Sequence, residues 1–272
     1  MLFIILIVFI LVFITCYVYF HFYSKKIEQY DDGSTDIQIG DFNVYVLNLD
    51  RAKDRLESFI ETYMQSDLKY KQFTRVSAVD GKKLVLKDHV SERALKEIED
   101  ANKQGFRVRH YSLTAGAVGC ALTHMKTYEL VASSEMPYGL IFEDDVLIDQ
   151  NIFEKMNAVL RTIPSDWDIL LLGCFCVACD KYTTYYNTNR FFLLHGYLIK
   201  KESAEKILLS LQNKKIEQQI DSELSDLVEQ DYLKIYCLRT GLAQQGNFKT
   251  SIQLPIKITS GINPYSTVDQ TV

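Results

Sequence analysis

The sequence has no excess of positive charge, no internal repeat and no low-complexity tract. Its 30 Lys and Arg residues stand against 35 Asp and Glu residues, which gives a formal net charge of −5 at pH 7. Nucleic-acid-binding domains usually carry a basic face, so this charge gives no general reason to expect a nucleic-acid partner. The 272 residues suffice for one large domain or two small ones.

The arrangement of the six cysteines does not match a disulfide framework. One of them, Cys16, lies in the apolar N-terminal stretch, which leaves an odd number elsewhere: Cys120, Cys174, Cys176, Cys179 and Cys237. The cluster at 174–179 lacks a second C-x-x-C pair and a nearby pair of histidines, which disfavours a structural zinc site. We therefore expect buried or loop thiols in a reducing compartment.

The N-terminal stretch contains no lysine or arginine before residue 25. Residues 2–23 are almost entirely Leu, Ile, Val, Phe and Tyr, and about 22 helical residues cover roughly 33 Å, enough to cross a bilayer. A signal peptide would have a basic start and a small-residue cleavage site, and both are missing. We predict a transmembrane anchor at residues 1–23 and a polar linker at 24–41.

The orientation of this predicted anchor stays open. Lys25 and Lys26 follow it, which favours a cytosolic position for the rest of the chain under the positive-inside rule. The absence of any Asn-x-Ser/Thr acceptor agrees weakly with that side. Analogy with anchored proteins of the Golgi and ER favours the lumenal side instead. The predicted localisation is thus a single-pass membrane protein.

The stretch that carries the strongest chemical signal is Tyr138–Gln150, YGLIFEDDVLIDQ. An apolar run indicates a buried strand, and three carboxylates follow it: Glu143, Asp144 and Asp145. Since alternate residues of an extended segment share a face, Glu143 and Asp145 would point the same way. Such a pair suits Mg²⁺ or Mn²⁺ carrying a substrate diphosphate. The alternative is a solvated acidic turn after an edge strand.

Strands and helices are predicted to alternate along the chain. Apolar runs predict strands at 43–49, 73–79, 138–143, 167–173, 191–200 and 232–238, and helical periodicity predicts helices at 51–65, 89–104, 113–133, 153–161 and 204–211. This order implies an α/β fold with a mostly parallel sheet and helices on both faces. Ligands of such sheets bind at the carboxyl ends of the strands, where the three acids fall. Gly116 and Gly119 would let their helix approach another backbone or a ligand closely.

Eight short motifs, in order between residues 42 and 254, resemble glycosyltransferase family 25, which includes bacterial lipooligosaccharide and animal collagen galactosyltransferases. They are Val44–Arg51 with Arg55, Val76–Gly81, Gly116–His124, Ile141–Val146, Asp166–Leu170, Gly196–Ile199 with Ala204–Leu208, Ile220–Asp221, and Leu242–Gln245 with Ser251. The chain departs from the family pattern at Ala117-Val118, where a carboxylate is frequent, and at Lys200, where a serine is usual.

The resemblance implies a GT-A-like catalytic domain at residues 42–262, followed by a C-terminal tail at 263–272. It further implies a UDP-sugar donor, most often UDP-galactose, a divalent cation (Mn²⁺ or Mg²⁺), and inversion at the anomeric carbon. Asp145 is then the first choice for metal ligand and Glu143 the second, with Asp144 supporting the metal or the ribose. Asp221 is the implied catalytic base, with a helix N-cap as the alternative role.

Further residues are predicted to bind the nucleotide, because they follow the first strands of the sheet. Asn48, Arg51 and Arg55 follow the first strand, and Asp80 follows the second. Arg51 could pair with the diphosphate, because a guanidinium suits phosphate oxygens. The alternative for Arg55 is a charge on the helix surface, and the alternative for Asp80 is a plain turn residue. His124 is a further candidate, with a satisfied core histidine as its alternative. His195 could reach the metal or the diphosphate, on weaker grounds.

The sequence thus predicts a membrane-anchored, metal-dependent glycosyltransferase. It would move a sugar, which the resemblance implies is galactose, to a glycan, glycolipid or hydroxylated protein. The alternative is a degenerate, inactive transferase that acts as a membrane-tethered binding protein. A nucleotidyltransferase would bring a basic Gly-rich loop for the triphosphate, and the sequence contains none.

Overall fold

The computed structural model describes residues 36–107 and 112–246. Contacts divide the chain into two compact units, residues 1–36 and 37–272, and the described residues lie almost wholly in the second. Ile37 is buried, and both its N–H and its carbonyl bond to the side chain of Asn157. The folded unit therefore includes the last residues of the predicted linker 24–41, whereas the predicted tail 263–272 lies outside the described residues.

The structure contradicts the predicted localisation as a single-pass membrane protein. Within residues 36–107 and 112–246, no helix is both long enough and apolar enough to cross a bilayer. The predicted anchor, residues 1–23, lies outside these described ranges.

Eight strands form one sheet in the order β2-β1-β3-β8-β5-β9-β7-β6. Their bounds are β1 Phe42–Asn48, β2 Phe73–Ser77, β3 Tyr138–Glu143, β5 Ile169–Leu171, β6 Phe175–Lys181, β7 Tyr185–Phe192, β8 Gly196–Lys200 and β9 Ile235–Leu238. Two further strands, β4 (Val146–Ile148) and β10 (Ala243–Gln245), pair with each other in antiparallel fashion.

The α/β class is confirmed, but the expectation of a mostly parallel sheet is wrong. The pairs β1–β2, β1–β3 and β5–β9 are parallel. Strand β8 runs antiparallel to both β3 and β5, and β7 runs antiparallel to both β6 and β9. β6 and β7 are consecutive strands joined by a short turn, and such neighbours pair antiparallel because a parallel pair needs a long crossover. β8 instead enters the sheet between β3 and β5 and runs opposite to both.

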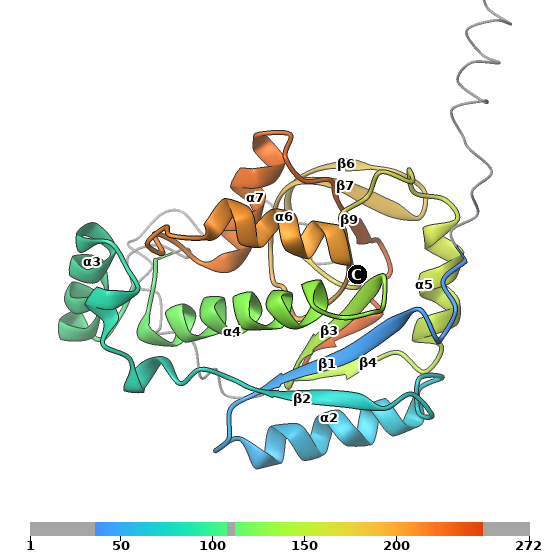
Figure 1. Cartoon of the computed structure of the whole chain (residues 1–272), viewed down its shortest axis with the longest axis horizontal. Coiled ribbons are helices and arrows are strands. Elements are labelled where there is room, and N and C mark those ends of the chain that lie inside the picture. The colour runs from blue at the N-terminus through green and yellow to red at the C-terminus, as the bar shows by residue number, and fades with distance from the viewer. Residues whose placement is uncertain (1–35, 108–111, 247–272) are drawn as a thin grey trace, which may run out of the picture. The chain divides into compact units, whose positions relative to one another are not determined.

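Helices cover both faces of the sheet, as the alternating pattern predicted (Figure 1). On one face, α2 (Lys53–Gln65) and α5 (Ile152–Leu160) pack against β1 and β3 through side chains such as Phe59, Met156 and Phe142. On the other face, α4 (Ala115–Ala132), α6 (Lys201–Leu211) and α7 (Ile220–Glu229) pack through Tyr128, Ile207 and Leu224. A further helix, α3 (Glu92–Gln104), joins a smaller cluster with the first turn of α4.

A close approach fixes the wall formed by α4 and the loop after β2. A Cβ atom added at Gly119 would collide with the Val79 carbonyl, and one added at Gly81 would collide with the Ala115 carbonyl. The Thr123 hydroxyl also accepts the Val79 N–H at 2.9 Å. The expected close approach at Gly119 is therefore confirmed, and the neighbour is backbone of the same chain.

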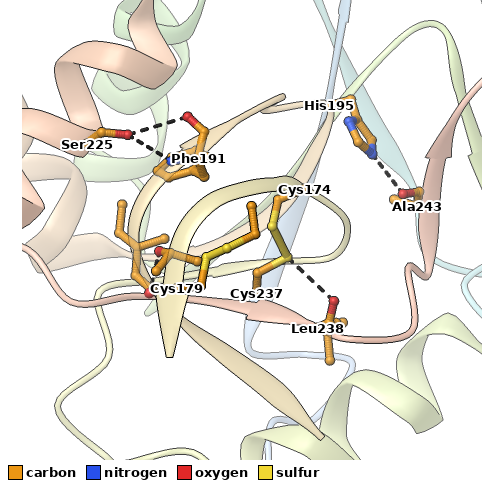
Figure 2. The surroundings of a disulfide bond; sticks show 11 residues. Cys174, Cys179, Phe191, His195, Ser225, Cys237, Leu238 and Ala243 are labelled. Atoms are coloured by element: carbon orange, nitrogen blue, oxygen red, sulfur yellow. Dashed lines mark hydrogen bonds between the residues drawn. A yellow bond between two sulfur atoms is a disulfide. The ribbon is translucent and has the colours of Figure 1, made fainter. Parts of the chain in front are cut away.

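Four of the cysteines form two disulfides, Cys174–Cys237 and Cys176–Cys179 (Figure 2). The first joins the segment after β5 to β9, and the second lies within β6. Cys120 is the free cysteine of the described residues. The prediction of thiols in a reducing compartment is wrong for these four side chains, since disulfides persist in oxidising surroundings. Residues 63 positions apart cannot be paired from spacing alone, which is why the sequence did not reveal the bridge.

We predict that the Cys174–Cys237 bridge contributes far more stability than the Cys176–Cys179 bridge. The first closes a loop across 63 positions and the second across 3, so the chain-entropy model assigns about 4 and about 2 kcal/mol to them. Denaturant unfolding of the double variants Cys174→Ala/Cys237→Ala and Cys176→Ala/Cys179→Ala measures both losses. Equal losses in the two variants would contradict the prediction.

Candidate active site

The three acids occupy the end of β3 and the turn that joins it to β4. Glu143 is the last residue of β3, while Asp144 and Asp145 form the turn before Val146. Because the extended backbone ends at Glu143, the alternation expected for Glu143 and Asp145 does not hold. Asp144 and Asp145 both contact Arg55 of α2, whereas Glu143 contacts Cys120 and His124 of α4. The turn thus divides the carboxylates between two helices.

Arg55 provides the positive charge that accompanies the two aspartates. Its Nη2 atom lies 2.5 Å from Asp144 Oδ1 and 2.7 Å from Asp145 Oδ2, and all three side chains are at least nine-tenths buried. Asn48 at the end of β1 donates to the other Asp144 oxygen at 2.6 Å and accepts a hydrogen bond from Arg75. Buried charges need such partners, because their solvation by water is lost. The structure therefore excludes the alternative of Arg55 as a surface charge.

Burial governs the protonation of the aspartates. It raises the pKa of Asp144 to about 6, even though Arg55 and Asn48 act in the opposite direction. Burial and the neighbouring Glu143 charge raise the pKa of Asp145 as well. Burial also acts to raise the pKa of Glu143, but the hydrogen bond and charge of His124, together with the charges of His195 and Arg55, lower this pKa below its ordinary value. Glu143 is accordingly the most acidic of the three carboxyl groups.

A cleft opens beside the acids, at the carboxyl ends of β1, β2 and β3. Of the predicted site residues, Arg51, Arg55, Asp80, Glu143 and Asp144 line this cleft. Arg51 and Asp80 form an ion pair with each other, and Asp80 also accepts the Lys82 N–H, so it is both a turn residue and a cleft residue. Asn48 and Asp145 reach the same place through their bonds to Asp144 and Arg55.

His124 and Cys120 form the part of the site that contacts Glu143. His124 is fully buried, and its Nδ1 lies 2.8 Å from the Tyr197 hydroxyl, while its Nε2 lies 3.4 Å from Glu143 Oε1. The Cys120 sulfur lies 3.7 Å from the same oxygen. Burial and the charge of Glu143 raise the pKa of the Cys120 thiol well above its ordinary value. Sequence reasoning missed Cys120, although it belongs to the small-residue helix motif that pointed to His124.

Asp221 lies in the first turn of α7, so it is not the N-cap that the alternative role required. Its carboxylate accepts the N–H groups of Leu193 and Ser222, at 3.2 and 2.8 Å. Leu193 has a left-handed backbone with φ of 75°, a conformation that a leucine adopts only when its surroundings impose it. Burial raises the pKa of Asp221. Asp221 therefore holds the segment that leads to His195 and β8.

Two buried acceptor atoms near the acids have no hydrogen-bond partner among the described residues: Asp145 Oδ1 and His195 Nδ1. The other ring nitrogen of His195 donates to the Ala243 carbonyl at 2.7 Å, as Figure 2 shows, which leaves a lone pair on Nδ1. Gln245 of β10 donates weakly to the second Asp145 oxygen at 3.4 Å. An unpaired buried acceptor is costly, so both atoms suit contact with a cation.

The sequence model of the family described as "Glycosyltransferase family 25 (LPS biosynthesis protein)" matches residues 42–224. Human procollagen galactosyltransferase 2 is 25% identical over 198 residues, which are 68% of this chain and 29% of that protein. The human inactive glycosyltransferase 25 family member 3 is 27% identical over 141 residues, which are 50% of this chain and 22% of that protein. The chain thus spans less than a third of the length of these relatives.

Among solved structures, a Drosophila β1,4-galactosyltransferase 7 mutant in complex with manganese, UDP-Gal and xylobiose is 11% identical. Its TM-score is 0.37, and the match covers 77% of this chain and 76% of that one. A glycosyltransferase involved in the glycosylation of the major capsid of PBCV-1 is 12% identical with a TM-score of 0.31, over 64% of this chain and 66% of that one.

The raised pKa of Asp144 predicts a loss of stability as the pH rises. The folded-state value of about 6 lies above the ordinary 3.8, so the folded protein holds this proton more tightly than the unfolded chain does. Ionisation of Asp144 between pH 4 and pH 7 then lowers the free energy of unfolding by about 3 kcal/mol. Asp144→Asn lacks this ionisation. Its free energy of unfolding, measured with denaturant in EDTA, should therefore rise by about 3 kcal/mol relative to that of the wild type between pH 4 and pH 7.

Asp149→Asn is the matched control for this pH dependence. Partial burial acts to raise the pKa of Asp149, but the hydrogen bonds from Lys155 and from the Asn151 N–H, together with the charge of Lys155, lower this pKa below its ordinary value. This variant should therefore lose stability relative to the wild type as the pH rises, which is the opposite sign. Parallel pH profiles of wild type and Asp144→Asn would rule out the assigned shift.

Proposed function

Since the chain belongs to glycosyltransferase family 25, we propose that it is a metal-dependent glycosyltransferase with a GT-A-like catalytic domain. It transfers a sugar from a UDP-sugar donor, galactose from UDP-galactose in the first instance, with inversion at the anomeric carbon. The acceptor is a glycan, a glycolipid or a hydroxylated protein. One observation carries the proposal: the cleft at the carboxyl ends of β1, β2 and β3 is lined by Glu143 and Asp144, which lie within the residues that the family model matches.

The donor set around the acids fits a divalent cation. Asp145 Oδ1 and His195 Nδ1 are both buried, and neither atom has a hydrogen-bond partner among the described residues. Asp145 is our first choice as ligand, with Glu143 second. Carboxylate oxygens with one imidazole suit Mn²⁺ and Mg²⁺. When bound, the cation would offset the negative charge that develops on the leaving diphosphate.

Three basic side chains of the cleft are suited to bind the diphosphate of the donor. Arg51, Arg55 and Lys82 line the cleft, and Asp144 and Asp145 hold Arg55 in place. A guanidinium matches phosphate oxygens with two parallel hydrogen bonds, so Arg51 is the better candidate for direct contact. To contact the phosphate, Arg51 would have to give up its ion pair with Asp80. Asp80 would then be free to turn toward the nucleoside. Asn48 and Arg75 keep Asp144 in position.

Asp221 is our candidate for the base that takes the proton of the acceptor hydroxyl. Burial raises its pKa, which makes the carboxylate a better proton acceptor than an exposed aspartate. Its two backbone hydrogen bonds fix its orientation, and the charges of Glu143 and His124 act on it. His124 would serve as a positioning residue through its contact with Glu143.

Donor binding is tested by thermal unfolding of the full chain with a panel of UDP- and other NDP-sugars, with and without Mn²⁺. One UDP-sugar should stabilise the protein only when Mn²⁺ is present, by about 2.7 kcal/mol at a hundred times its Kd. Asp145→Asn should abolish this effect. Asp149 pairs with Lys155 at the surface, so Asp149→Asn should retain the effect. A folded protein that no nucleotide stabilises would contradict the proposal.

Turnover distinguishes an enzyme from the alternative, a degenerate binding module, which deserves a test because one relative is named inactive. Asp221→Asn keeps the size of the side chain and one acceptor oxygen, so Leu193 can remain bonded. We expect kcat to fall by about 10²- to 10⁴-fold while stabilisation by donor and Mn²⁺ is unchanged. Donor binding without release of UDP in the wild type would favour the binding module.

A further inference from the structure

Cys120, His124 and Glu143 bring three different metal-binding groups together on one side of the cleft. A thiol and an imidazole, one turn apart on α4, face the carboxylate at the end of β3. One ligand atom from each lies within 4.8 Å of the other two. The set is separate from the Asp144–Asp145–Arg55 cluster, which lies toward α2. Two elements that meet in the core therefore create a mixed sulfur, nitrogen and oxygen donor set.

The hydrogen bonds around His124 determine which atom faces Glu143. The Tyr197 hydroxyl donates to the Tyr128 hydroxyl at 3.2 Å, so it accepts the Nδ1 proton of His124 at 2.8 Å. The Nε2 atom then faces Glu143 either as an imidazolium N–H or as a lone pair. This is the arrangement of metal-binding histidines, whose second nitrogen usually donates to a fixed acceptor.

The distances resemble those of a zinc site. Nε2 and Glu143 Oε1 are 3.4 Å apart, which is longer than the about 2.7–2.9 Å of a tight charge-assisted hydrogen bond, so a bound ion can replace this long hydrogen bond. Around a tetrahedral zinc ion with bonds of about 2.0–2.3 Å, an N···O pair lies about 3.3 Å apart and an S···O pair about 3.5 Å apart. The observed separations of 3.4 and 3.7 Å come close to both values.

Access and the types of ligand are also suitable. Cys120 and Glu143 both line the cleft, so an ion can reach them from solvent, while His124 lies fully buried behind them. Thiolate and imidazole select borderline-soft cations such as Zn²⁺, whereas the aspartates beside them offer oxygen alone. The two donor sets would therefore prefer different metals.

We propose that Cys120, His124 and Glu143 form a three-ligand site for Zn²⁺, with its fourth position open to the cleft. Binding requires the thiolate, so the Cys120 thiol gives its proton to solvent when the ion binds. Three protein ligands and one open position are the arrangement of zinc sites that accept an exogenous ligand. The site shares Glu143 with the cation site proposed above, where Glu143 is the second-choice ligand, but the argument for it does not require the glycosyltransferase activity.

The test is a titration of the full chain with Co²⁺, which replaces Zn²⁺ and absorbs light when a thiolate binds it. The wild type should develop a thiolate-to-cobalt charge-transfer band together with the intense visible bands of a tetrahedral ion, and Zn²⁺ should abolish both. Cys120→Ser should lose the charge-transfer band. Asp145→Asn should keep it, because Asp145 belongs to the other donor set. Tyr197→Phe should weaken Co²⁺ binding about 10-fold, because His124 loses its acceptor.

Thermal unfolding without metal shows whether each variant is folded, and Cys120→Ser is expected to fold because serine is nearly isosteric and this position is partly exposed. Two results would overturn the proposal. One is a folded wild-type protein that gives no charge-transfer band with Co²⁺. The other is a band that persists unchanged in Cys120→Ser, since its sulfur would then come from another residue.

Discussion

The contact between Arg55 and the paired aspartates is the interaction on which the site depends. Two neighbouring carboxylates in a buried turn repel each other and lose their water, and one guanidinium from α2 lies against both. Because Asn48 of β1 holds one of them from the other side, three elements meet at this point: α2, β1 and the turn after β3. The position of the acids is thus fixed by the same packing that builds the sheet.

The turn also explains why the acids are chemically unequal. Asp144 and Asp145 face a guanidinium in a buried pocket and hold their protons more tightly than free aspartates do. Glu143, one residue earlier, faces an imidazole and a thiol and becomes more acidic. Adjacent positions in the sequence therefore offer an oxygen-rich environment on one side and a softer one on the other. A motif of three consecutive acids does not convey this difference.

Local patterns predicted the elements that carry the site. Apolar runs located β1 and β3, helical periodicity located α2 and α4, and the rule that ligands bind at strand ends brought Asn48, Arg55, Asp80 and the acids together. Long-range features escaped prediction for physical reasons. The direction of β8, the pairing of Cys174 with Cys237, and the unpaired lone pair of His195 all depend on neighbours far away in the chain. The prediction that Glu143 and Asp145 point the same way failed because the strand ends at Glu143 and a turn begins at Asp144.

The packing of Gly119 and Gly81 has a mechanical consequence. Backbone touches backbone there, without side chains that could shift to absorb a displacement. The loop at 78–81 and the helix α4 must therefore move together as one stiff wall of the cleft. Any widening or closing of the cleft around a ligand then has to involve the loop after β1, from which Arg51 extends to its ion pair with Asp80 and remains partly exposed.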